Sequence, residues 1–295
     1  MTTATAPAPA ATRSGGLGYM VQSAFWFAVM GLLVKLASAN VPTLQIVFVR
    51  GAITLAIASL VLLRARLSPF GGEWRLLLTR GLVGSCAMIC FYAAVVNLPL
   101  AEATVIHQTA PLFTAIFAAA VLHERISPRV LVALLGAFAG VVLLAQPHWL
   151  FGGDARGRAD EWLFALVALL GAILSAVAYV TVRRLGRSEN PLVVVFWLPL
   201  LTLPVSAPFA IPAWVWPDAL TWVWLLGIGL STQIAQVSLT KGLARETAGR
   251  ATAVGYLQVA FATVFSATFL DVWPDALGLC GMALIVGALL FGTRR

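Results

Sequence analysis

Residues 91–145 read FYAAVVNLPLAEATVIHQTAPLFTAIFAAAVLHERISPRVLVALLGAFAGVVLLA. The charged turn around Glu124 and Arg125 separates two apolar runs, each about twenty residues long. An α-helix needs about 20 apolar residues to cross a bilayer core of about 30 Å. The stretch therefore predicts membrane-spanning helices, and the same pattern continues along the rest of the chain.

Apolar runs of this kind occupy almost the whole sequence. Hydrophobic residues make up 61% of the 295 residues and charged residues only 10%, so too little polar sequence remains for a separate soluble domain. The sequence predicts an all-α integral membrane protein with ten transmembrane helices. These spans are expected near 17–39, 43–63, 76–96, 100–121, 128–146, 161–182, 191–210, 219–239, 248–270 and 274–292.

The basic residues fall almost entirely on one side of these predicted spans. The net charge of +8 comes from this asymmetry, so we interpret it as membrane topology and expect no nucleic-acid partner. By the positive-inside rule the basic side is cytoplasmic, with both termini inside, as in a protein of the bacterial inner membrane. On this side we place Arg13, Arg64, Arg66, Arg75, Arg80, Arg125, Arg129, Arg183, Arg184, Arg187, Lys241, Arg245, Arg250, Arg294 and Arg295, and on the other only Arg156 and Arg158.

The two halves of the chain resemble each other. Pro111 lies thirteen residues before Glu124, and Gln258 lies thirteen residues before Asp271. Five spans per half would turn the second half over in the membrane, which is the inverted repeat of many secondary transporters; an ordinary bundle with a chance repeat is the alternative. The expected parts are a disordered tail at 1–16, a first repeat at 17–146, a periplasmic linker at 147–160 and a second repeat at 161–293.

The stretch 91–145 resembles the carboxyl-terminal part of an EamA repeat in the drug/metabolite transporter superfamily. Lys35 and Arg50 stand where that family often has a basic residue. The second half departs from the family pattern, because Gln258 and Val259 replace the usual proline region and Asp271 replaces a common glutamate. Within the superfamily the chain is similar to bacterial YddG-type exporters of aromatic amino acids, and this resemblance implies two inverted five-helix EamA repeats.

Three ionisable residues within the predicted spans are candidates for charge recognition or coupling. Lys35 and Arg50 are expensive to place in hydrocarbon, although Lys35 can snorkel to the interface and Arg50 can bond to exposed carbonyls. His107 lies four residues before Pro111, whose missing N–H leaves the His107 carbonyl without its helical partner. A histidine that titrates near neutral pH fits a substrate or proton contact there, and a hydrogen bond to another helix is the alternative.

A wider set of polar and aromatic side chains is expected to line a central cavity. Each could instead form an ordinary interhelical hydrogen bond. The cavity would be uncharged, amide-bearing and aromatic, and would suit a zwitterion with an apolar side chain, whereas aspartate, glutamate and lysine would be excluded. The substrate-binding candidates are Gln22, Trp26, Tyr92, His107, Pro111, Ser175, Tyr179, Gln233, Gln236, Tyr256 and Gln258.

These features predict a secondary transporter that exports aromatic and other apolar amino acids by alternating access. The alternatives are an exporter of another small metabolite or drug, and a passive channel-like facilitator. The sequence lacks the P-loop, HExxH and GxSxG motifs, so we expect no enzyme, no cofactor and no metal. The expected partners are the amino-acid substrate and the lipid bilayer. The spacing of Gly136 and Gly140 predicts close helix packing, either within its own half of a monomer or between copies in a homodimer.

Overall fold

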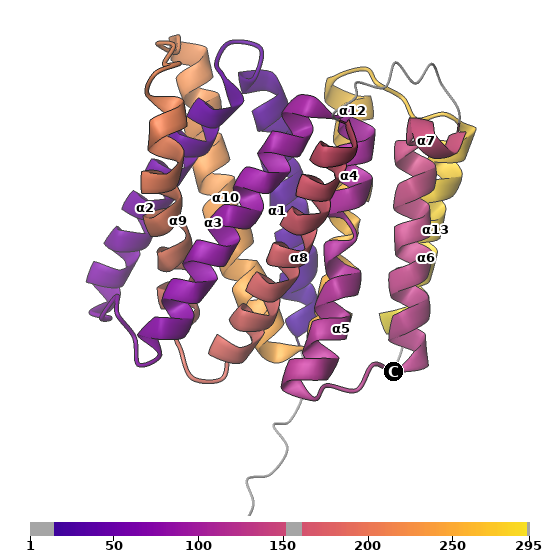
Figure 1. Ribbon diagram of the computed structural model, residues 1–295, viewed down its shortest axis with the longest axis horizontal. Helices are drawn as coiled ribbons and strands as arrows, with labels where there is room; N and C mark the ends of the chain where they lie inside the picture. Colours follow the sequence, from indigo (N-terminus) through magenta and orange to yellow (C-terminus); the bar gives the residue numbers. More distant parts are fainter. Residues whose placement is uncertain (1–14, 152–160, 294–295) are drawn as a thin grey trace, which may run out of the picture.

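The computed structural model describes residues 15–151 and 161–293, and every regular element in these ranges is a helix. Figure 1 shows the long helices side by side as one bundle. The helices are α1 (Gly16–Ala37), α2 (Thr43–Ala65), α3 (Trp74–Asn97), α4 (Leu100–His107), α5 (Ala110–Leu122), α6 (Pro128–Ala145), α7 (His148–Phe151), α8 (Glu161–Leu185), α9 (Pro191–Ala210), α10 (Ala219–Arg245), α11 (Ala248–Gly255), α12 (Leu257–Phe269) and α13 (Ala276–Thr293).

These helices confirm the prediction of an all-α membrane protein with about ten spans. In the described residues, nine helical segments are long and apolar enough to cross a membrane, and α13 adds a shorter apolar helix. The fourth predicted span is divided into α4 and α5, and the ninth into α11 and α12. The short α7 connects α6 to the residues before α8.

The packing of the helices follows a two-fold relation between the halves. Helix α8 of the second half corresponds to α1, and α10 corresponds to α3. Helix α1 packs against α10, and α8 packs against α3 in the same way. Helices α2 and α9 pack against each other, as do α6 and α13, so each of these pairs joins corresponding elements. Such paired contacts are expected for inverted repeats and not for a bundle whose internal similarity is accidental.

Glycines bring α6 and α13 into close contact. A side chain at Gly140 would meet the carbonyl oxygen of Gly281 at 2.6 Å, and one at Gly136 would meet Ala288 at 2.9 Å. The predicted small-residue spacing therefore does serve helix packing. The expectation that these glycines pack within their own half is wrong, because α13 belongs to the second half.

The ends of the bundle differ in charge, as the sequence predicts. The connections between α2 and α3, α5 and α6, α8 and α9, and α10 and α11 all lie at the end where Figure 1 marks the C terminus, and we call this the basic end. The predicted tail and the predicted linker lie largely outside the described residues, which do not include 1–14 or 152–160.

Candidate functional site

Two interrupted helices mark the centre of the bundle. Helix α4 ends at His107 and α5 begins at Ala110, with Pro111 in its first turn. Proline has no N–H and its ring clashes with the preceding turn, so the helix cannot continue unbroken. In the second half α11 ends at Gly255 and α12 begins at Leu257, with Tyr256 between them. Broken helices of this kind form the substrate sites of many transporters with inverted repeats.

A buried tyrosine joins the two interruptions. Tyr256 is fully buried, and its hydroxyl donates a hydrogen bond of 2.9 Å to the carbonyl of Gln108. A carbonyl released from a helix within a membrane needs such a partner because no bulk water is available. The sequence predicts a free carbonyl at His107 and a substrate contact at Tyr256, but the structure uses Tyr256 to satisfy the neighbouring carbonyl of Gln108.

The first of three cavities lies beside these interruptions, and we call it the break cavity. It has a volume of about 50 Å³, and its lining includes His107, Pro111, Tyr179 and Gln258, four of the predicted site residues. The ring centroids of His107 and Phe91 are 4.4 Å apart, so the imidazole packs on an aromatic side chain. Helices α1, α10 and α11 and the α4–α5 interruption itself supply the rest of the wall.

The second cavity lies between α2, α9 and α10, and we call it the middle cavity. It has a volume of about 20 Å³ and is lined by Arg50, Gln233 and Gln236, which the sequence also predicts. The Arg50 guanidinium contacts the sulfur atoms of Met30 and Met88. The side-chain oxygen of Gln233 is buried and has no hydrogen-bond donor among the described residues.

The third cavity, of about 230 Å³, is larger than the other two and lies between α2, α3 and α9 away from the basic end, and we call it the end cavity. Its lining is largely apolar and includes the predicted residue Tyr92. Thr202 lines both this cavity and the middle cavity. The hydroxyls of Ser85 and Thr202 are 3.0 Å apart and form a hydrogen bond in the wall of the end cavity.

Besides Tyr256, four predicted candidates do not line these cavities. Gln22 is exposed and accepts a hydrogen bond from Ser238, while Trp26 packs edge-on against Phe25. Ser175 is not among the residues that line the three cavities. Lys35 is exposed in the last turn of α1, where a lysine can snorkel to the interface.

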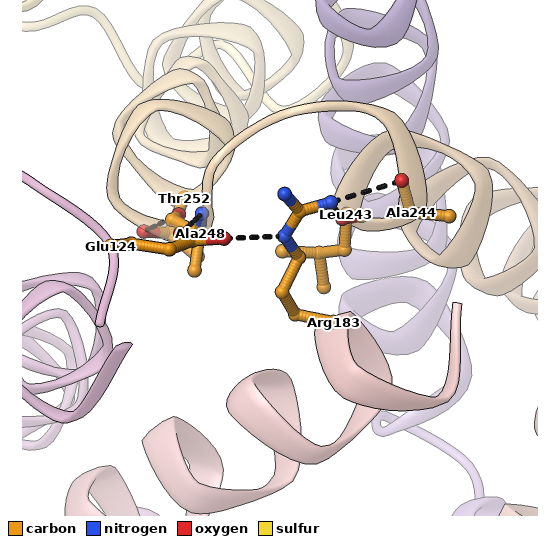
Figure 2. Close-up of polar contacts among 6 residues, drawn as sticks. All are labelled: Glu124, Arg183, Leu243, Ala244, Ala248 and Thr252. Atoms are coloured by element: carbon orange, nitrogen blue, oxygen red, sulfur yellow. Dashed lines mark hydrogen bonds and ion pairs between the residues drawn. The ribbon is translucent and has the colours of Figure 1, made fainter. Parts of the chain in front are cut away.

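An ion pair that the sequence does not predict joins helices of the two halves at the basic end. Figure 2 shows Glu124, which follows α5, and Arg183 of α8 pointing toward each other. The Arg183 Nε donates to Glu124 Oε1 at 2.7 Å, and both side chains are largely buried, with exposed fractions of 13% and 10%. We call this pair and its backbone partners the latch.

The latch also binds the facing ends of two helices. Arg183 Nη1 donates to the carbonyls of Leu243 and Ala244, each at 2.9 Å, near the end of α10. Glu124 Oε2 accepts from the backbone N–H of Ala248 at 2.7 Å, where α11 begins. Carbonyls at a helix C-terminus and N–H groups at an N-terminus lack intrahelical partners. The partial negative charge of the carbonyls favours the Arg183 guanidinium, and the partial positive charge of the N–H groups favours the Glu124 carboxylate.

Comparison with known proteins agrees with this architecture. The profile of the EamA-like transporter family matches residues 14–146 and 162–293. The chain belongs to the EamA-like transporter family. It is 31% identical to the pseudopaline exporter CntI of Pseudomonas aeruginosa, covering 95% of this chain and 96% of CntI.

Two further comparisons extend this relationship. Solute carrier family 35 member G1 of Mus musculus is 32% identical, with 93% of this chain and 78% of the relative covered. A protein of known crystal structure superposes with a TM-score of 0.81 at 24% identity, over 95% of this chain and 97% of that one, and therefore shows the same fold.

These findings establish the chain as a multi-pass membrane protein of a transporter family. The relative CntI is an exporter of pseudopaline, which supports the export of a small metabolite. The transporter family also agrees with the expectation that the protein is not an enzyme. The narrower resemblance to YddG-type exporters of aromatic amino acids receives no support from the relatives named above.

Proposed function

We propose that this EamA transporter exports amino acids, or small metabolites derived from them, across the bacterial inner membrane by alternating access. The observation that carries the proposal is the position of the middle cavity. It holds a guanidinium and an unpaired amide oxygen between elements of both halves, with α2 from the first and α9 and α10 from the second.

The chemistry of this cavity suits the common part of an amino acid. Arg50 offers N–H donors to a carboxylate, and a guanidinium can bind a carboxylate through two parallel hydrogen bonds. The unpaired oxygen of Gln233 is an acceptor for an ammonium group. The neighbouring end cavity, which is lined mainly by apolar residues, would hold an apolar or aromatic side chain.

In alternating access the latch would be the barrier that must break before the basic end can open. Arg183 and Glu124 connect the end of α5 in the first half to α8, α10 and α11 in the second. Opening the basic end would require the two side chains to separate, while the end cavity lies toward the other side of the membrane. A change between two such packings is the usual form of a transport cycle.

Counterflow in proteoliposomes tests the proposed function. Vesicles loaded with an unlabelled amino acid should transiently accumulate the same labelled amino acid, and a panel should include phenylalanine, tryptophan, methionine, leucine and glutamate. Accumulation above equilibrium indicates a carrier. A passive channel would equilibrate the label without overshoot, and the absence of flux for every amino acid would remove the amino-acid assignment and leave another metabolite or drug.

Replacement of Gln233 by alanine should weaken substrate binding in this assay. Loss of a hydrogen bond to a buried partner costs about 1–3 kcal/mol, which corresponds to a roughly 5- to 150-fold change in apparent affinity. Gln22→Ala is the matched control, because this amide is exposed. Equal affinities in Gln233→Ala and the wild type would show that Gln233 does not bind substrate.

The proposed orientation predicts opposite labelling of two single cysteines. Arg66, after α2, lies at the basic end, and Trp149, in α7 with an exposed fraction of 63%, lies at the opposite end. In intact cells a membrane-impermeant thiol reagent should label Trp149→Cys but not Arg66→Cys, and inside-out vesicles should give the reverse. The opposite pattern would reverse the proposed direction of the whole bundle.

A further inference from the structure

Two arginines lie within membrane-spanning helices without a carboxylate partner in the described part of the chain. Arg80 of α3 is 4% exposed, and its Nε has no hydrogen-bond acceptor there. The guanidinium of Arg50 in α2 contacts the sulfur atoms of two methionines. The ion pairs observed in 15–151 and 161–293 include neither arginine. A charge removed from water is strongly destabilised unless an opposite charge or several hydrogen bonds replace its hydration.

No carboxylate of the described chain is placed to neutralise them. The acidic residues of these ranges lie in the connections between helices or within one turn of a helix end, so the interior contains cations without anions. These residues are Glu73, Glu102, Glu124, Glu189, Asp218, Glu246, Asp271 and Asp275, together with Glu161 at the first position of α8. Any neutralising anion in the interior therefore has to come from outside the described chain.

The side chain of Arg80 extends toward the middle of the membrane. Helix α3 begins at the basic end, and a snorkelling arginine near its start would turn back toward that end. The Nη1 atom instead lies where a Cβ at Gly84 would stand, one turn further into the bilayer. A glycine at this position thus provides the space that the guanidinium occupies. The sequence-based placement of Arg80 among the cytoplasmic basic residues is wrong for its side chain.

The two guanidiniums approach the same face of α3. Arg80 reaches Gly84, and the Nη2 of Arg50 contacts the sulfur of Met88. Residues four apart lie on one helix face, about 6 Å apart along the axis. The groups are therefore held on successive turns. Leu198, which lines the middle cavity, also lies 2.9 Å from the position that a Cβ at Gly84 would take, so this face of α3 adjoins that cavity.

We propose that Arg50 and Arg80 form a two-arginine anion site. The exported metabolite then carries at least two carboxylates, which outnumber its ammonium groups and give it a net negative charge. The inference rests on the proposed function and names its substrate class: acidic amino acids or carboxylate-rich amino-acid derivatives. Each guanidinium can bind one carboxylate in a bidentate manner, and the oxygen of Gln233 can accept from an ammonium group. Acidic substrates are then favoured, contrary to the sequence-based expectation of their exclusion.

Thermal unfolding of the purified full-length protein in detergent tests this site. The probe is glutarate, whose carboxylates lie about one helical turn apart, and glutaramide is its uncharged counterpart. Ionic strength is held constant with sodium chloride. At about ten times its Kd, glutarate should raise Tm by roughly 2–5 °C in a saturable manner, and glutaramide should not. A glutarate effect no larger than that of chloride would overturn the proposal.

Variants connect the effect to the two arginines. Arg80→Gln and Arg50→Gln should each lose the glutarate shift, whereas Arg75→Gln, an exposed position in the first turn of the same helix, should keep it. If Arg80→Gln fails to fold, Gly84→Ala takes its place, because this change displaces the guanidinium without removing it. Gly84→Ala should raise the Kd for glutarate, measured from the Tm shift, at least fivefold. A full shift in Arg80→Gln or Gly84→Ala would exclude Arg80 from the site.

The outcomes separate this inference from the proposed function. A saturable glutarate shift that needs both arginines, without counterflow of any amino acid, would support the anion site and refute amino-acid export. Phenylalanine counterflow without a glutarate shift would support the proposed function and refute the anion site.

Discussion

Arg183→Ala is expected to lower the free energy of unfolding by about 3–5 kcal/mol, the usual cost of removing one partner from a buried ion pair. The change leaves the Glu124 carboxylate without its cation and the carbonyls of Leu243 and Ala244 without a donor. Denaturant titration of the purified protein measures the loss. Because the same bonds join the two halves at the basic end, the variant should also expose this end to the solvent more often.

A neighbouring residue gives the matched control for the latch. Arg184 follows Arg183 in the same helix but is exposed, and surface substitutions usually change stability by no more than about 0.5 kcal/mol. We therefore expect Arg184→Ala to unfold like the wild type. Equal losses in the two variants would mean that general charge at the basic end, and not the latch, stabilises the protein.

Tyr256→Ala should destabilise the protein by about 3–5 kcal/mol, as is typical for loss of a large buried aromatic side chain. Tyr256→Phe keeps the ring and removes only the hydroxyl that donates to Gln108, so it should cost about 1–3 kcal/mol. The same denaturant titration compares the two variants. If Tyr256→Phe is as stable as the wild type, the bond between the two helix interruptions contributes nothing.

The spans were predictable from sequence because each one is a long apolar run. Pro111 also explains the break between α4 and α5, since proline cannot continue the hydrogen-bond pattern of a helix. The break at Tyr256 has no proline and could be inferred only from the internal repeat, which aligns Gln258 with Pro111. Local sequence thus predicts one interruption, and the symmetry of the fold explains the other.

The orientation of each helix about its own axis was harder to predict. The face of α1 that packs in the bundle is made of small and apolar residues such as Ser23, Ala24 and Ala28, while Gln22 is exposed. A helix that is apolar on all sides has no hydrophobic stripe to indicate which face packs inward. For this reason the sequence predicts Gln22, Trp26 and Ser175 in the cavity wall, which they do not line, and by the same reasoning it predicts Tyr179 and Gln258, which do line the break cavity.

Long-range pairs were beyond the reach of sequence patterns. Glu124 and Arg183 are far apart in the chain: Glu124 follows α5, Arg183 lies in the last turn of α8, and each stands in a charged stretch that could face water. Arg80 lies close enough to the basic end to suggest snorkelling, and only the space at Gly84 shows that its side chain turns inward. Both features depend on the packing of elements from different parts of the sequence.

The central claim is that the cavities between the inverted halves, the break cavity among them, open alternately to the two sides of the membrane. Gly255 lines the break cavity and has open space where a side chain would begin, so a thiol can be introduced there with little disturbance. The background should lack Cys86, Cys90 and Cys280, the three native cysteines. A small membrane-impermeant thiol reagent is then applied to right-side-out and inside-out vesicles.

Gly255→Cys should react from both sides, and Arg183→Ala in the same background should increase the rate from the basic end and decrease it from the opposite end. This opposite change in the two rates is expected because loss of the latch shifts the population between two states. Labelling from one side only, unchanged by Arg183→Ala in a variant that still transports, would contradict alternating access through this cavity.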